Sequence, residues 1–257
     1  MIVIFFALSQ EIASIKSKVN ILGKIRFGHA IFYHAEFCGF PVALVQTGMG
    51  QNVSSVLQHL SQKFRIQLII SSGFAGALQS GIDVGDIVIG KKVLYATEET
   101  FEKKALSNSS LPCETSISDE VPGFPNSYRF KVHYGLVATT NRILHLSSDK
   151  KLLGNNTSAI AVDMESFMIA EQAHILGIPF VVVRAISDRA DENVDICENL
   201  VTREGKINVP AVVFYLLKKP YGILALNRLR KQAKSATSSL SAFLPDFITQ
   251  IYNTLLK

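Results

Sequence analysis

Short apolar segments alternate with amphipathic ones along the first two hundred residues of the chain. Such alternation is typical of a largely parallel sheet that is covered by helices on both faces. We therefore expect an α/β fold, a three-layer α/β/α sandwich with a mixed, largely parallel central sheet. The expected strands are Ile2–Phe6, Ala30–Phe37, 41–46, 68–71, 87–89, 135–139 and 180–186. The expected helices begin at Ser9 as a cap, span 52–64, and run from Asp163 to a stop at Gly177.

Two regions depart from this pattern. Residues 107–128 are rich in Ser, Pro and Glu and are expected to form a mobile excursion. Beyond residue 202 the chain becomes basic and helical, with Pro210 opening a segment that ends at Pro220, followed by 221–236 and an apolar stretch at 243–256. We expect an α/β domain over 1–202 and a helical appendage over 203–257 that packs on the same domain. A basic amphipathic element lying on an anionic membrane surface is the alternative.

The net charge of +5 comes from this appendage. Residues 203–257 hold nine Lys and Arg against two Asp and Glu, whereas the first 202 residues hold 17 against 19. The basic excess is thus absent from the α/β part, which argues against a nucleic-acid-binding core.

The cellular compartment is predicted from the lack of an export or membrane-spanning segment and from the spacing of the cysteines. The apolar N-terminal run lacks a positive region and ends at Ser9, and no stretch approaches the roughly 18 apolar residues of a membrane span. Cys38, Cys113 and Cys197 are too far apart to suggest a metal site or a disulfide framework. We expect a cytoplasmic protein, with peripheral contact on the inner face of the membrane as an option for the tail.

Three acidic residues adjoin strand ends or helix starts, where an open α/β sheet forms its ligand crevice. Glu11 follows the first strand, Glu165 lies near the start of an apolar helix, and Asp188 follows the strand at 180–186. Each also has a structural interpretation. Glu11 would complement a helix dipole, Asp163 near Glu165 would cap a helix, and Asp188 would pair with Arg184 or Arg189. Two glycine segments, 48–50 and 73–76, also follow strands, where backbone can approach a ligand closely.

In this order, five segments of the chain resemble the successive motifs of the purine nucleoside phosphorylase and methylthioadenosine/S-adenosylhomocysteine nucleosidase superfamily. The resemblance covers roughly residues 1–200, and its Met-Glu and Ser-Asp elements are the most specific. The segments are Thr47-Gly48-Met49-Gly50, Ser72-Gly73-Phe74-Ala75-Gly76, Val84-Gly85-Asp86-Ile87-Val88, Ala161-Val162-Asp163-Met164-Glu165 and Arg184-Ala185-Ile186-Ser187-Asp188.

The resemblance implies a role for individual residues. Met164 and Glu165 match the pair beneath the ribose, where the glutamate holds the sugar hydroxyls. Ser187 and Asp188 match the pair at the purine, where the aspartate protonates N7 of the leaving base. Glu11 matches the glutamate that activates water in the nucleosidase branch, so Asp188 and Glu11 are the expected catalytic residues. The other expected substrate-binding residues are Gly48, Met49, Phe74, Ala75, Gly76 and Ile143.

Cleavage of an N-glycosidic bond explains why such residues are needed. The reaction leaves an oxocarbenium-like sugar and an anionic purine, as in glycoside hydrolysis. An acid at the purine neutralises the leaving group, so Asp188 must be protonated or share a proton with the base. Glu165 would place negative charge near the developing cation.

The chain departs from the family pattern at three positions. Phosphorolytic members have an arginine where this chain has Ser71 and a serine or threonine where it has Phe74, and Ile143 takes the place of an aromatic over the purine. Loss of the arginine weakens phosphate binding, because a bidentate guanidinium is hard to replace. The basic tail and Phe74, however, resemble the hopanoid-associated phosphorylase branch.

From this resemblance we expect phosphorolysis of an adenosyl group with a hydrophobic 5′ substituent, as in adenosylhopane. The alternatives are a hydrolytic methylthioadenosine/S-adenosylhomocysteine nucleosidase and a catalytically silent nucleoside-binding protein. A purine nucleoside is the expected small-molecule partner, with phosphate as an optional co-substrate and with no cofactor or metal. The resemblance also implies a homo-oligomer, at least a dimer.

Overall fold

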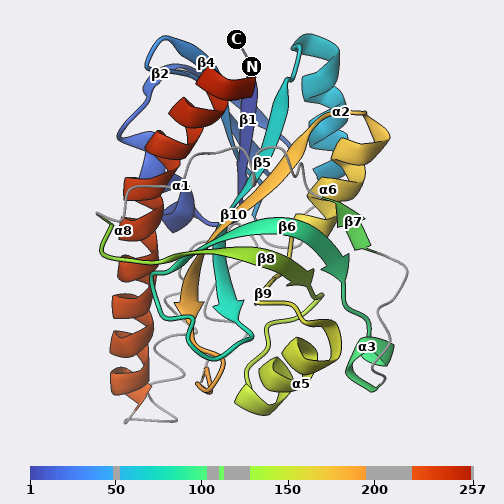
Figure 1. Cartoon of the computed structure of the whole chain (residues 1–257). Helices are drawn as coiled ribbons and strands as arrows, with labels where there is room; N and C mark the ends of the chain where they lie inside the picture. Colours follow the sequence, from blue (N-terminus) through green and yellow to red (C-terminus); the bar gives the residue numbers. More distant parts are fainter. Residues whose placement is uncertain (49–52, 103–109, 113–127, 195–221, 256–257) are drawn as a thin grey trace.

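The computed structural model describes residues 1–48, 53–102, 110–112, 128–194 and 222–255. Within them, a ten-stranded mixed sheet lies between two layers of helices (Figure 1). Apolar side chains alternate between the two faces of β1 (Ile2–Phe6). Ile4 belongs to one buried cluster and Phe5 to the other.

The N-terminal part of the sheet is open. β1 pairs in parallel with both β4 (Phe40–Gln46) and β5 (Leu68–Ala77). β3 (Ala30–Phe37) continues the sheet antiparallel to β4, and β2 (Asn20–Phe27) forms its edge. The side chains of β2 are mostly exposed, so this strand contributes little to the core.

The other part of the sheet closes into a ring of strands. β5 pairs in parallel with β10, β10 is antiparallel to β6, β6 is parallel to β8, β8 is parallel to β9, and the end of β5 is antiparallel to β9. A short strand, β7, is attached to β6. These strands are β6 (Ile87–Tyr95), β7 (Ser110–Pro112), β8 (Val132–Thr139), β9 (Ala161–Asp163) and β10 (Phe180–Asp188).

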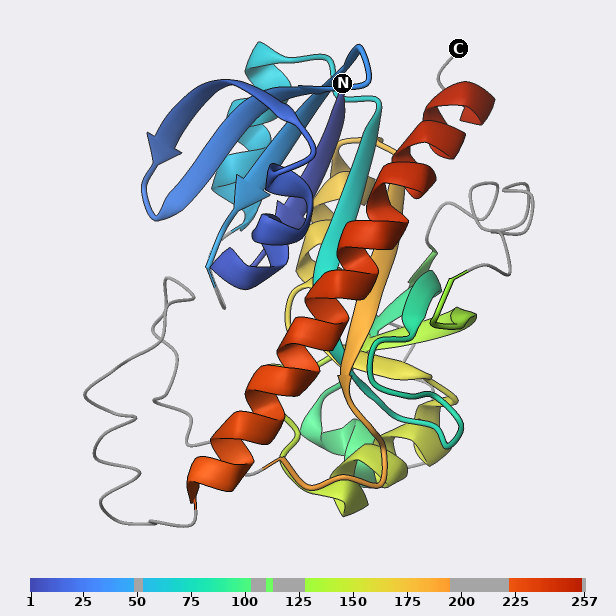
Figure 2. The same ribbon diagram turned by 90° about the vertical axis from the view of Figure 1, so that its left-hand side faces the viewer.

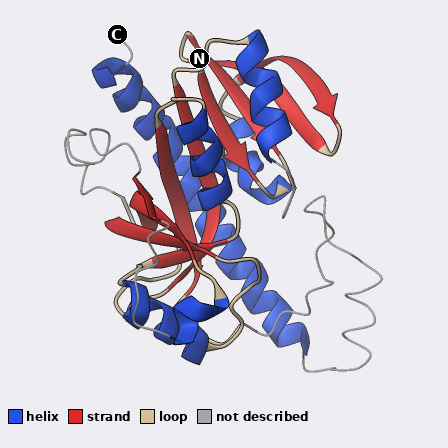
Figure 3. Cartoon of the chain, turned by 90° about the vertical axis from the view of Figure 1, so that its right-hand side faces the viewer, coloured by secondary structure: helices blue, strands red, loops and turns tan. Residues whose placement is uncertain are grey.

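Helices cover both faces of the sheet and one end of the ring. α1 and α8 pack on one face, and α2 and α6 on the other (Figures 2 and 3). α3 and α5 pack together at the end of the ring, where a third apolar cluster lies. The bounds are α1 (Ser9–Lys16), α2 (Val53–Lys63), α3 (Glu98–Glu102), α5 (Ser147–Thr157), α6 (Ser166–Ile175) and α8 (Gly222–Leu255).

The C-terminal segment contains one long helix that is part of the core. α8 crosses the sheet diagonally beside α1 (Figure 2). It runs without a break across residues 237–242, where a separation between two segments was expected, and it continues through Pro245. Its apolar face is thereby used for packing inside the molecule, which removes the argument for membrane contact through this face. The predicted helix over 211–219 lies outside the described residues. The fully buried apolar residues of α8 are Ala236, Leu240, Phe243, Leu244, Phe247, Ile248 and Ile251.

Two predicted helix starts are wrong. Asp163 does not open a helix, because it ends β9, and α6 begins at Ser166. Ser9 is the first residue of α1 and not its cap. Leu8 holds the cap position there, and the Glu11 carboxylate accepts its N–H. Among the described helices, none is both long enough and apolar enough to cross a membrane.

Candidate active site

The candidate site forms where β5 and β10 run side by side. Gly73 of β5 lies opposite Arg184 of β10, and Gly76 lies opposite Asp188. A β-strand rises about 3.3 Å per residue, so these two pairs are about 10 Å apart. Glu11, in the first turn of α1, reaches the Gly73 end. The two expected catalytic carboxylates therefore lie at opposite ends of one strand segment.

Glu11 is buried, with 3% of its surface exposed. Its Oε2 accepts hydrogen bonds from the N–H groups of Ala7 (3.0 Å) and Leu8 (2.7 Å), and its Oε1 accepts one from Phe74 (2.8 Å). Burial raises the pKa of Glu11, while the Arg184 guanidinium and these three N–H groups oppose the rise. A held carboxylate with a raised pKa is suited to take a proton from water near neutral pH.

Gly73 permits the close approach of Glu11 and Arg184. A Cβ at position 73 would lie 2.5 Å from Nη1 of Arg184 and 2.6 Å from Oε1 of Glu11, and the φ of Gly73 is +155°. Gly76 has the same role at the other end, where a Cβ would lie 3.0 Å from Oδ2 of Asp188. Both glycines let side chains lie directly against the backbone of β5.

Arg184 is the centre of a buried polar network at the Glu11 end. Its Nη2 donates to the hydroxyls of Ser71 (2.8 Å) and Ser166 (2.9 Å) and lies 2.7 Å from Oδ2 of Asp163. Asp163 in turn accepts hydrogen bonds from the Thr139 hydroxyl (2.7 Å) and the Ser166 N–H (3.2 Å). A buried charge is stable only with such partners, and the charge of Arg184 is matched here by Asp163.

Glu165 is the half-buried N-cap residue of α6. Burial raises its pKa to about 8. The nearby Arg184 lowers it, whereas the charges of Asp163 and Glu11 raise it further. At neutral pH most of the Glu165 population is therefore protonated, so this carboxyl can both donate to and accept from sugar hydroxyls.

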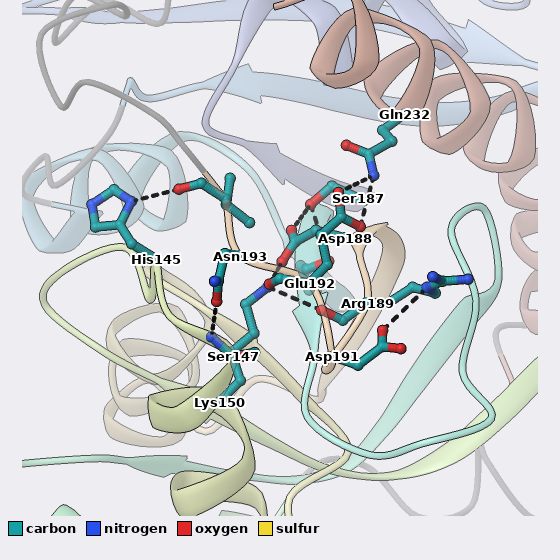
Figure 4. Close-up of polar contacts among 12 residues, drawn as sticks. His145, Ser147, Lys150, Ser187, Asp188, Arg189, Asp191, Glu192, Asn193 and Gln232 are labelled. Atoms are coloured by element: carbon teal, nitrogen blue, oxygen red, sulfur yellow. Dashed lines mark hydrogen bonds and ion pairs between the residues drawn. The ribbon is translucent and has the colours of Figure 1, made fainter. Parts of the chain in front are cut away.

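Asp188 lies at the far end of β10, and its partner is unexpected. Ser187 Oγ donates to its Oδ1 (2.6 Å), and Oδ2 forms an ion pair with Lys150 of α5 (Figure 4). The predicted structural partner was Arg184 or Arg189, and the contact with Lys150 corrects this. The Asp188 side chain therefore accepts one hydrogen bond from a hydroxyl and one from an ammonium, and its remaining lone pairs can accept from a ligand.

The remaining predicted residues fall into three groups. Gly48 is buried with a φ of +84° and donates its N–H to the Ala7 carbonyl, while Met49 lies outside the described residues. Phe74, Ala75 and Gly76 lie on β5, and the Ala75 carbonyl oxygen lies 3.2 Å from Oγ of Ser187. Met164 and Ile143 are half-buried in the segments before α6 and α5. Residues 73–76 of β5 thus extend from the Glu11 end of the site to the Asp188 end.

Sequence reasoning missed two cationic residues of the site. Arg184 was considered only as a partner for Asp188, although an arginine inside an apolar strand is a signal of a buried polar cluster. Lys150 was not considered, because the polar sequence of α5 shows little helical pattern. Each cation contacts one of the predicted carboxylates or lies beside it.

Chemically, the cluster offers a basic carboxylate, a second carboxyl and a guanidinium at one end. At the other end it offers a carboxylate held by a hydroxyl and an ammonium. Most enzymes that cleave glycosidic bonds use two separated carboxyl groups, one on each side of the bond. The distance between the ends allows one to act on the sugar and the other on the leaving group.

The amino-acid sequence is similar to that of a known protein family and of individual members of it. The family described as the Phosphorylase superfamily matches residues 1–212. A 5′-methylthioadenosine/S-adenosylhomocysteine nucleosidase from Staphylococcus haemolyticus is 30% identical over 227 residues, which cover 85% of this chain and 99% of the relative.

Solved structures share the fold. An MTAN variant from Helicobacter pylori with 5′-methylthioadenosine in its active site has a TM-score of 0.72 at 18% identity, covering 97% of this chain and 98% of the other. A methylthioadenosine/S-adenosylhomocysteine nucleosidase from Neisseria meningitidis in complex with methylthio-immucillin-A has a TM-score of 0.71 at 20% identity, covering 96% and 97%. The expected α/β fold class is confirmed by this likeness.

Proposed function

This chain belongs to the Phosphorylase superfamily, and from that premise we propose that it hydrolyses the N-glycosidic bond of an adenine nucleoside with a small 5′-thio substituent. The predicted class of enzyme, one that transfers a glycosyl group at this bond, is confirmed by the family. The named relatives are nucleosidases, which favours the hydrolytic alternative over the expected phosphorolysis of adenosylhopane.

The observation that carries the proposal is the charge balance around Glu11. The one guanidinium at this end, in the described part of the chain, belongs to Arg184, which is 1% exposed and already paired with Asp163. Glu11 and Glu165 add two more carboxyl groups, and Ser71 stands where phosphorolytic members carry an arginine. A phosphate dianion would meet no uncompensated positive charge in this cluster, whereas a neutral water molecule needs none.

The proposed steps assign each group one task. Water attacks C1′, and Glu11 takes its proton. The C1′–N9 bond breaks, and its electron pair stays with the purine. The purine gains a solvent proton at N7, where the Asp188 carboxylate stabilises it by a charge-assisted hydrogen bond. Glu165 binds the ribose hydroxyls beside the developing sugar cation.

The test is adenine release from methylthioadenosine and from a long-chain 5′-alkyl adenosine, each with and without phosphate. We expect phosphate-independent release that favours methylthioadenosine. Phosphate-dependent release that favours the long chain would instead support the adenosylhopane type of substrate. Tight binding with no turnover of either compound would support a silent nucleoside-binding protein.

The Glu11→Gln variant tests the nucleophile within the same assay. We expect a loss of roughly 10² to 10⁴ in rate, the usual contribution of a general base. The matched control is Glu36→Gln, at an exposed position on β3, which should keep the wild-type rate. Equal rates for both variants would contradict the role of Glu11. A homo-oligomer and a cytoplasmic location remain predictions, to be checked by light scattering and by cell fractionation.

A further inference from the structure

Lys150 is one of the most buried side chains of the protein, with 1% of its surface exposed. Its ammonium has three N–H donors and three acceptors around it. They are the Asp188 carboxylate, the Arg189 carbonyl (3.1 Å) and the Glu192 carbonyl (3.0 Å) (Figure 4). All its donors are therefore used within the protein, so Lys150 acts on a ligand only through Asp188.

The segment that supplies these acceptors is itself fixed to α8. The Glu192 side chain is 7% exposed, and Gln232 Nε2 donates to both of its carboxylate oxygens (2.7 and 2.9 Å). Arg228 Nε lies 2.8 Å from the same carboxylate. Lys150 thus joins α5 to a segment that α8 already holds, and the carboxylate of Asp188 is fixed in position.

The contacts also define what Asp188 offers to a ligand. Lys150 donates to Oδ2 and Ser187 donates to Oδ1. A carboxylate with two donors of this kind is an acceptor only. The Asp188 carboxylate accepts hydrogen bonds from N–H or O–H groups of a ligand and repels a ligand atom that presents only a lone pair.

We propose that Lys150 is a positioning residue that makes Asp188 select 6-aminopurines over 6-oxopurines. The inference rests on the proposed function, which places the purine at Asp188. An adenine offers N–H donors at its 6-amino group, whereas a hypoxanthine presents a carbonyl oxygen there. Without the ammonium, Oδ2 of Asp188 loses its charged donor and the contact that holds it in place, so the discrimination against a 6-oxo base should fall.

The test compares two nucleosides that differ only at C6, methylthioadenosine and methylthioinosine, on the full-length protein. We expect the wild type to favour the 6-amino compound in kcat/KM. In Lys150→Met the preference should fall by roughly ten- to a hundredfold, the usual range for one charged hydrogen bond. Lys150→Gln, which keeps N–H donors but loses the charge, should show the same fall. Lys150→Arg should retain the preference.

Two controls separate selection from folding. Lys151→Met removes the exposed neighbouring lysine and should change nothing. Gln232→Leu loosens the 188–192 segment from α8 and should lower both rates alike. Both substrates are measured on one preparation, so a loss of folded protein cancels in the ratio.

The outcomes are distinct from those of the proposed function. A wild type that fails to cleave methylthioadenosine overturns the proposed function itself. A wild type that cleaves it, with a preference that stays unchanged in Lys150→Met and Lys150→Gln, overturns the role of Lys150 alone.

Discussion

Glu165 and Asp188 experience opposite electrostatic surroundings at the two ends of the site. Glu165 is surrounded by two other carboxyl groups and one guanidinium, and its pKa is raised to about 8, mainly by burial. Asp188 is in direct contact with an ammonium. The protein thus keeps a carboxyl that is largely neutral at the sugar and a carboxyl in contact with an ammonium at the base, so two different surroundings give the same functional group two chemical roles.

The raised pKa of Glu165 predicts a pH-dependent stability. Between pH 4.5, its ordinary pKa, and pH 8, the folded state binds this proton more tightly than the unfolded state, so stability falls as pH rises. Glu165→Gln cannot ionise and should melt at least about 2 °C higher than the wild type at pH 8. The difference should shrink toward zero near pH 5. Thermal denaturation at both pH values checks this, with the exposed Glu171→Gln as the control.

Removal of the Asp188 charge is predicted to stop catalysis without destroying the fold. Asp188→Asn keeps the shape and one acceptor for Lys150, but it cannot stabilise a protonated purine by a full charge. Turnover of methylthioadenosine should fall roughly 10² to 10⁴-fold, while the circular dichroism spectrum stays unchanged. The control is Asp191→Asn, a side chain that is 61% exposed in the same segment. Near-normal turnover by Asp188→Asn would disprove the role at the base.

At the scale of elements, β5 organises the site because it pairs with three other strands. β1 and β10 flank its first part, and β9 pairs with its end. The pairing with β10 sets the register of Arg184 and Asp188, and the glycines of β5 make space for the side chains that lie over it. Strand pairing and glycine placement together determine the geometry of the carboxylates.

A methyl group on β5 is predicted to disrupt this arrangement. In Gly73→Ala, the new Cβ meets Arg184 and Glu11, both of which are held by other hydrogen bonds, so activity should fall more than tenfold and stability by about 1–3 kcal/mol. Gly23→Ala on β2 has no atom within 4 Å of the new Cβ and serves as the control. Activity assays and urea denaturation measure both effects. Unchanged activity in Gly73→Ala would show that the close packing is dispensable.

The sequence predicted some elements well and missed others for physical reasons. The strands β1 and β3 were predicted with their observed bounds, because β1 is an unbroken buried apolar run and most positions of β3 are buried and apolar or aromatic. β2 was missed because its apolar residues are interrupted by Gly23, Lys24 and Arg26, so they form no continuous run. α5 was missed because it is mostly polar and buries a lysine instead of an apolar stripe. The pairing of Lys150 with Asp188 could not be read without the fold that brings α5 to β10.

At the scale of the whole molecule, α8 completes one layer of the sandwich. It packs against α1 and β10, and its buried residues join the same cluster as Ile4 and Phe6 of β1. The helical, basic character of this segment was evident from the sequence. Its continuity across 237–242 was not, because the Ser and Thr residues of this stretch are weak helix formers and separate the expected segments 221–236 and 243–256.

Loss of the packing of α8 is predicted to destabilise the entire protein. Phe243 is fully buried, so Phe243→Ala should lower the free energy of unfolding by about 3–5 kcal/mol. Leu224→Ala, at a side chain on the same helix that is 70% exposed, should stay within about 0.5 kcal/mol of the wild type. Urea denaturation compares them. A small effect of Phe243→Ala would mean that the core forms without α8.

The central claim is that water, and not phosphate, attacks the sugar at the Glu11 end of the site. It is tested most directly by turnover of methylthioadenosine in ¹⁸O-labelled water with unlabelled phosphate present, followed by mass spectrometry of the sugar product. We expect a free sugar that carries one ¹⁸O at C1. A sugar 1-phosphate without the label would contradict it.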